Sequence, residues 1–211
     1  LSFSMNSLVK GDRLADAIRS KIGTDLIEDL PVKFTAVAAD IAAEKEHWFQ
    51  SGPVDQAIRA SVSLPLFFTP HTVDGVQLID GGILNPTPIE PTLADDTDLT
   101  VAVDLGGPMM KQAIPEPEKA QSPWHQKMDD FLESMKFSES KPKDQWDMFY
   151  IADQSFNTMQ NAIARERMAD NPPDHLIAVP RNKCGTLEFD RSAEMIEYGY
   201  QLAEKQLTGK I

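Results

Sequence analysis

The stretch Leu78-Ile79-Asp80-Gly81-Gly82-Ile83-Leu84-Asn85-Pro86-Thr87-Pro88 says most about how this chain folds. A short apolar run leads into an acidic residue that is followed by two glycines. Because glycine has no Cβ, the backbone after Asp80 can turn sharply and another group can approach it closely. Asp80 is therefore a candidate for a carboxylate displayed in a cleft. The alternative is a plain turn, since Asp and Gly are common in turns for conformational reasons alone.

A hairpin is predicted immediately before this stretch. Two apolar segments, 66–73 and 76–79, flank Asp74-Gly75, a pair that favours a type I′ turn because both central residues take positive φ. With these two residues as the loop, Thr69 is expected to face Asp80. The hairpin would therefore present Asp80 at the end of its second strand.

Several neighbours of Asp80 are candidate site residues. Asn85 and Pro88, together with Pro86, are predicted to hold the chain that leaves Asp80 as a rigid support. Of the four histidines, His71 alone is expected near Asp80, as a candidate substrate contact or as an ordinary solvated or packed side chain. No pair of histidines has the spacing of metal ligands on one helix face, so no metal site is predicted.

Outside this region the chain alternates between buried strands and amphipathic helices. Residues 31–40 form a mostly apolar run that predicts a central parallel strand, and 99–107 and 176–180 are two further runs of this kind. Apolar residues at helical spacing predict helices over 10–22, 145–168 and 192–207. A helix is also predicted over 53–61, with Pro53 in its first turn, where no amide hydrogen is needed. The pattern predicts an α/β fold, with a mainly parallel sheet flanked by helices.

No repeat or linker divides the chain, so residues 1–211 are predicted to form a single domain. Residues 108–143 are rich in Pro, Lys, Glu and Ser and predict a mobile loop or lid with one short helix near 128–135. The Met and aromatic residues of 146–168 are expected in the core, with an acyl-binding groove as the alternative.

Composition excludes several classes of function. A formal net charge of −13 argues against binding to nucleic acid, because the average field repels phosphates. The single cysteine, Cys184, fits a reducing compartment and predicts a cytoplasmic protein. No apolar run approaches the ~18 residues of a spanning helix. The acidic run Asp95-Asp96-Thr97-Asp98 lacks the Gly and distal Glu of a calcium loop and is expected to be solvated.

Motifs on both sides of Asp80 resemble the bacterial patatin-like phospholipases. The similar features are an Ala60-Ser61 pair, a Pro-and-Phe segment over 65–70, the hairpin, Asp80-Gly81-Gly82 with its Asn85-x-x-Pro88 tail, and the strand 101–104. Residues 29–40 and the final helix that follows Phe189-Asp190 also look like family features. The resemblance is close over about 10–105 and looser over about 145–205.

This resemblance implies a patatin-like fold, related to the α/β hydrolases, and a lipid acyl hydrolase with a Ser-Asp dyad. Asp80 matches the base of that dyad by position, and Gly81, Gly82, Asn85 and Pro88 are expected to support it. Lipids or small esters would be the substrates, with transient contact to a membrane surface. The resemblance implies no metal and no cofactor.

The serine half of the dyad is missing from these 211 residues. The family requires a glycine-rich oxyanion loop and a G-x-S-x-G elbow, and neither occurs in the sequence. We therefore expect a chain truncated at its N-terminus, or one that lost these elements, and no ester hydrolysis by this chain alone. Two alternatives stay open: a non-catalytic interaction module on the same scaffold, and a subunit of a split enzyme.

Overall fold

A computed structural model describes residues 12–65, 67–110, 148–185 and 188–209. Most of the predicted lid at 108–143, including its short helix, lies outside the described residues. The chain divides into two compact units, one comprising Leu1–Asp96 with Ser155–Pro172 and the other Thr97–Gln154 with Pro173–Ile211. The α/β class, with sheets flanked by helices, is confirmed.

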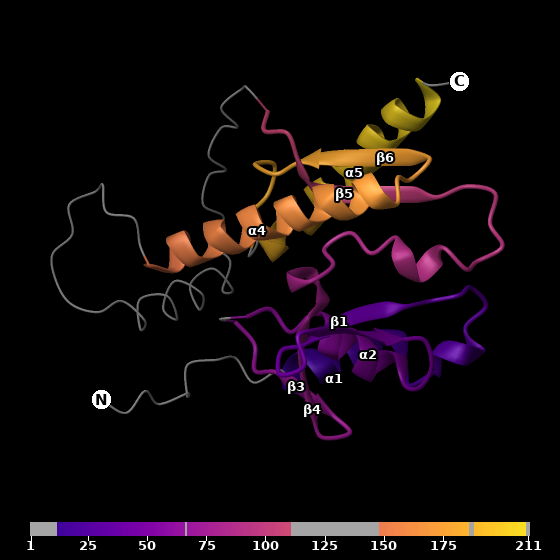
Figure 1. Ribbon diagram of the computed structural model, residues 1–211, viewed down its shortest axis with the longest axis vertical. Coiled ribbons are helices and arrows are strands. Elements are labelled where there is room, and N and C mark those ends of the chain that lie inside the picture. Colours follow the sequence, from indigo (N-terminus) through magenta and orange to yellow (C-terminus); the bar gives the residue numbers. More distant parts are fainter. Residues whose placement is uncertain (1–11, 66, 111–147, 186–187, 210–211) are drawn as a thin grey trace, which may run out of the picture. The chain divides into compact units, whose positions relative to one another are not determined.

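The first unit contains a four-stranded sheet in the order β2-β1-β4-β3 (Figure 1). Its strands are β1 (Ala36–Asp40), β2 (Lys45–Phe49), β3 (His71–Val73) and β4 (Val76–Asp80). All three pairings in this sheet are antiparallel. The sheet brings the end of β4, and with it Asp80, next to the centre of β1.

The predicted parallel pairing of residues 36–40 is wrong, because β1 runs antiparallel to both of its neighbours. An apolar run indicates that a strand is buried on both faces. A central strand is buried in this way whether its neighbours run parallel or antiparallel to it. A tight connection returns the chain into β2: the Asp40 carboxylate accepts the N–H groups of Ala42 and Ala43 at 2.9 and 3.0 Å. Strand β2 was not predicted, since its charged and polar residues hide the strand pattern.

Small side chains allow a helix to pack closely on this sheet. Helix α2 (Val54–Ser61) lies against β1 and β4, and helix α1 (Asp12–Ile22) packs on α2. The core between them consists of buried apolar residues: Ile27, Ala36, Ala38, Phe49, Val54, Ala57, Ala60 and Leu78. Four of these eight are alanines, so the helix backbone can approach the strands. Both helices were predicted, α1 from its periodicity and α2 from the proline at its start.

The β3–β4 hairpin has the predicted turn. Asp74 and Gly75 take φ values of 49° and 82°, so both central residues are in the left-handed region. Pairing begins at Val73 with Val76 and ends at His71 with Leu78. The predicted pairing of Thr69 with Asp80 does not form. Strand β3 begins only at His71, after Pro70, which has no N–H to donate, and the Asp80 N–H donates to the carbonyl oxygen of Ser63.

In the second unit, β5 (Val101–Gly107) and β6 (His175–Pro180) form a parallel pair, as their apolar runs predicted. Helix α5 (Ser192–Thr208) packs on β6. The long helix α4 (Met148–Asp170) contributes its residues from Ser155 onward to the first unit. Its apolar stripe is core only in part, because Ala164 is buried whereas Met159 is 53% exposed.

Candidate active site

Asp80 is held at the junction between β4 and a short 3-10 helix, η3 (Gly81–Ile83). Its carboxylate Oδ1 accepts the N–H of Gly82 at 2.7 Å. Its own backbone N–H donates to the carbonyl oxygen of Ser63 at 3.0 Å. Ser63 is fully buried and also bonds to Arg59 of α2. The backbone and the side chain of Asp80 are therefore both fixed by neighbouring segments.

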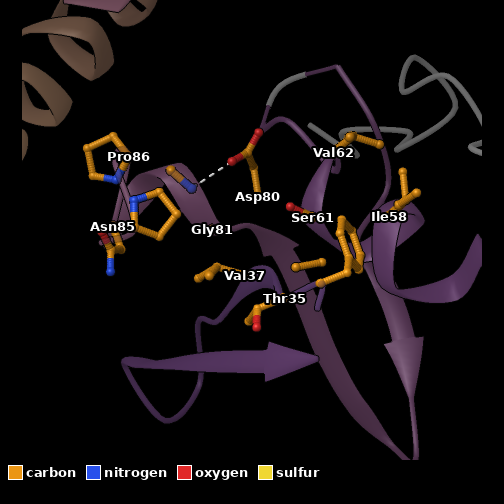
Figure 2. A pocket seen from close by; sticks show the side chains of 13 residues that line it. Thr35, Val37, Ile58, Ser61, Val62, Asp80, Gly81, Asn85 and Pro86 are labelled. Atoms are coloured by element: carbon orange, nitrogen blue, oxygen red, sulfur yellow. Dashed lines mark hydrogen bonds between the residues drawn. The ribbon is translucent and has the colours of Figure 1, made fainter. Parts of the chain in front are cut away.

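A pocket of about 290 Å³ opens beside this carboxylate. Figure 2 shows Asp80 between Pro86 and Asn85 on one side and Val62 and Ile58 on the other. The lining is largely apolar and comes from β1, α2 and the segment after β4: Phe34, Thr35, Ala36, Val37, Ile58, Ser61, Val62, Asp80, Gly81, Gly82, Asn85, Pro86 and Pro88. An apolar pocket with a few polar groups is the usual form of a small-molecule site.

Burial raises the pKa of Asp80 above its ordinary value of 3.8, because the charged form loses hydration. The hydrogen bond from the Gly82 N–H acts in the opposite direction but does not cancel the effect. A carboxylate in this situation takes up a proton more readily than a solvated carboxylate does. This is the property required of a general base.

The two glycines after Asp80 are needed because neighbouring groups lie close to them. Neither of them has a positive φ. A Cβ at Gly81 would lie 2.2 Å from the Val37 carbonyl oxygen, which belongs to the backbone of β1. A Cβ at Gly82 would lie 2.9 Å from Gln160 Nε2 and 3.0 Å from Asp80 Oδ1. Neither position can carry a larger side chain without movement of its neighbours.

Asn85 anchors the chain that leaves Asp80 into a charged network. Its side chain is 2% exposed, and its amide nitrogen donates to Glu46 at 3.1 Å and to Glu90 at 3.0 Å. Arg167 of α4 forms ion pairs with the same two carboxylates, at 2.5 Å to Glu46 and 3.0 Å to Glu90. The network therefore joins β2, the segment after β4, the 3-10 helix η4 (Glu90–Thr92) and α4.

The charges within this network stabilise one another. Burial opposes ionisation of Glu90, but hydrogen bonds from Asn85 and Arg167 lower the pKa of Glu90 overall. Burial also opposes the charge on Arg167, yet its contacts with Glu90 and Glu46 raise its pKa overall. Removing the cation would leave two half-buried carboxylates facing one buried amide.

We therefore expect Arg167→Met to destabilise the first unit by about 2 kcal/mol, between the values for exposed and buried ion pairs, because the Arg167 side chain is 32% exposed. Urea unfolding measures this loss. Arg165→Met is the matched control, since Arg165 lies on the same helix and is exposed. Equal losses for the two variants would contradict a structural role for the network.

His71 is not among the pocket-lining residues. It pairs with Leu78 in the hairpin, two residues from Asp80 along β4. Its Nε2 is buried without a hydrogen-bond partner among the described residues. Burial, and then the charge of Arg59, lower the pKa of His71 below 6.5, so its ring is neutral at neutral pH. Its role as a substrate contact stays a prediction.

Sequence reasoning missed several residues that the fold brings to this site. Ser61 lines the pocket from the end of α2, although in the sequence it stood out only as part of the Ala60-Ser61 pair. Glu46, Glu90, Arg167 and Gln160 come from three distant elements. The predicted support role of Asn85 pointed toward a buried anchor, but no pattern in the sequence identified its partners.

The described part of the chain holds no cluster of three or more His, Cys, Asp or Glu that could bind a metal ion. In the acidic run after residue 94, Asp95 accepts a hydrogen bond from Lys33 at 2.7 Å. None of the helices in the described ranges is both long and apolar enough to cross a membrane.

Comparison with known proteins agrees with this geometry. A family model for patatin-like phospholipases matches residues 1–93. An uncharacterized NTE family protein of Mycobacterium bovis is 31% identical, over 98% of this chain and 71% of the relative. The chain belongs to the patatin-like phospholipase family. Membership in this family supports the general class of lipid hydrolase.

Other patatin-like relatives match a smaller part. A second uncharacterized NTE family protein of Mycobacterium bovis is 34% identical over 48% of this chain and 17% of its own length. The rat patatin-like phospholipase domain-containing protein 7 is 28% identical over 50% of this chain and 8% of its own length. The family model, which ends at residue 93, covers the whole Asp80 pocket.

Proposed function

We propose that this patatin-like protein hydrolyses carboxylic esters of lipids with a Ser-Asp dyad in which Asp80 is the base. The observation that supports this most is the Asp80 carboxylate, fixed by the Gly82 N–H at the wall of a largely apolar pocket. Burial raises its pKa, so it accepts a proton more readily than a solvated aspartate. The apolar lining suits an acyl chain.

In the proposed reaction a serine Oγ attacks the ester carbonyl carbon while its proton passes to Asp80. The tetrahedral intermediate collapses to an acyl-enzyme, and Asp80 returns the proton to the departing alcohol. Water then attacks the acyl-enzyme with Asp80 again as the base, releasing the acid and restoring the serine. No metal or cofactor takes part in these steps.

This proposal requires a serine from outside the 211 residues, because the sequence holds no G-x-S-x-G. Ser61 shares the pocket but lacks the flanking glycines of an elbow. The serine would come from another segment of the same polypeptide or from a partner chain. We further propose a cytoplasmic protein that contacts lipid surfaces transiently, since its single cysteine fits a reducing compartment.

The absent elbow also favours a second candidate, a non-catalytic interaction module that keeps the patatin-like scaffold. In such a module the Asp80 pocket would bind a ligand without turning it over. The two candidates differ in whether a nucleophilic serine is ever delivered to Asp80.

A fluorophosphonate probe distinguishes the two candidates. If the reading frame upstream of Leu1 encodes a glycine-rich turn and an elbow, the protein translated from it should be labelled on that serine. Labelling should fail in the Asp80→Asn variant, because the serine then lacks its base. An unlabelled wild-type protein would favour the non-catalytic module. The 211-residue chain alone should stay unlabelled.

A further inference from the structure

Helix α4 brings a second polar side chain to the Asp80 carboxylate. Gln160 Nε2 and Asp80 Oδ1 both lie within 3.0 Å of the point where a Cβ would stand at position 82. The two atoms therefore border the same small volume beside Gly82. The nitrogen, which is the donor end of the amide, is the atom on this side, as expected next to an anionic acceptor.

The position of Gln160 is supported by the ion pairs of the same helix. Arg167 follows Gln160 by seven residues, which is about two helical turns, so both side chains lie on one face of α4. Arg167 fastens this face to Glu46 and Glu90 within the first unit. The same contacts that hold Asn85 therefore also place the Gln160 amide beside Asp80.

The amide of Gln160 has capacity for a ligand. In the described ranges of the chain we find no hydrogen bond to it, although its side chain is half-buried. Asp80 there accepts only the Gly82 N–H. With no acceptor among the described residues, this donor can bond an oxygen atom of a ligand in place of water.

We propose that Gln160 is a specificity-determining residue that donates a hydrogen bond from Nε2 to an acceptor oxygen of the ester bound beside Asp80. The inference rests on the proposed function, since it takes the ligand to be an ester. A neutral amide does not accept the proton of the reaction, so it can hold the substrate oxygen while Asp80 handles the proton. A side chain at position 82 would crowd Gln160 Nε2, so Gly82 leaves that donor unobstructed.

Two small ligands of similar length test this directly with the 211-residue chain. Methyl hexanoate carries the carbonyl oxygen, whereas methyl hexyl ether does not. Each is titrated while NMR follows the backbone amides of Gly81 and Gly82. We expect wild type to bind the ester about five- to tenfold more tightly than the ether, the usual effect of one uncharged hydrogen bond.

Gln160→Met should remove this preference and leave the affinity for the ether unchanged. Gln160→Glu, which keeps the length but loses the donor, should remove it as well. Gln56→Met, the same substitution at an exposed position of α2, should keep it. Urea unfolding checks that each variant is folded.

The proposal is overturned if wild type shows no preference for the ester or binds neither ligand. It is equally overturned if a folded Gln160→Met variant keeps the preference. Because binding is measured without turnover, its outcome is independent of the fluorophosphonate result. If the chain selects the ester through Gln160 but the probe never labels the protein, only the hydrolase proposal is overturned.

Discussion

Asp80→Asn should make the protein more stable at neutral pH and at the same time abolish ester hydrolysis. Burial raises the native pKa of Asp80 above 3.8, so ionisation of this side chain destabilises the native state relative to the unfolded chain. Asparagine carries no charge, and its side-chain oxygen can still accept the Gly82 N–H. In a serine-bearing form, hydrolysis should fall roughly 10³- to 10⁴-fold through loss of the base.

The pH dependence of this stabilisation has a definite sign. Below pH 3.8 the carboxyl group is protonated in both states, so wild type and Asp80→Asn should be about equally stable. As pH rises through the native pKa, wild type loses the stability that its protonated Asp80 contributed. The variant should therefore gain its advantage between pH 3.8 and the native pKa and keep it up to neutral pH.

Urea unfolding of both proteins from about pH 4 to about pH 8 measures this difference. Asp96→Asn is the control, because Asp96 is exposed in the same unit and should show no such gap. A variant that is less stable than wild type at every pH would show that the Asp80 charge is favourably solvated in its pocket. Retained hydrolysis in Asp80→Asn would remove Asp80 from the proposed mechanism.

Gly81→Ala should be among the most destabilising single-methyl substitutions in the chain. The new Cβ would stand 2.2 Å from the Val37 carbonyl oxygen and 2.5 Å from its carbonyl carbon. Both atoms belong to the backbone of the central strand β1, so no side chain can rotate out of the way. We expect a loss of about 3 kcal/mol, at the upper end for overpacking, and displacement of Asp80.

Gly199→Ala is the matched control for this substitution. Gly199 lies within α5, and a Cβ there would meet nothing within 4 Å. Alanine should therefore stabilise the helix, by up to about 1 kcal/mol. Thermal unfolding of the two variants should move in opposite directions. A Gly81→Ala variant as stable as wild type would show that β1 yields easily, and the fixed placement of Asp80 would then need another cause.

Much of the local structure could be predicted from single segments. The Asp74-Gly75 turn follows from residues that tolerate positive φ, and the structure has φ of 49° and 82° there. Helix α5 follows from apolar spacing, and helix α2 follows from the proline at its start. Asp80-Gly81-Gly82 lines a pocket at the end of the second strand of the hairpin, and its catalytic role stays a prediction. All of these depend on interactions between residues close in sequence.

The direction of strand pairing could not be predicted in the same way. Residues 36–40 are buried on both faces, and this burial is compatible with parallel or antiparallel neighbours. Strand β2 was not predicted because Lys45, Glu46 and His47 interrupt its apolar pattern. Among the described strands, only β5 and β6, which form a separate sheet, have the expected parallel pairing.

The sequence by itself determined that Asp80 would follow a hairpin strand and be flanked by glycines, because turn chemistry and the lack of a Cβ are local properties. The tertiary structure alone decided why each glycine is needed, since Val37 and Gln160 approach from distant segments. It also decided that Arg167, 82 residues after Asn85, shares two carboxylates with it. Such long-range contacts arise from packing of elements, which no local pattern encodes.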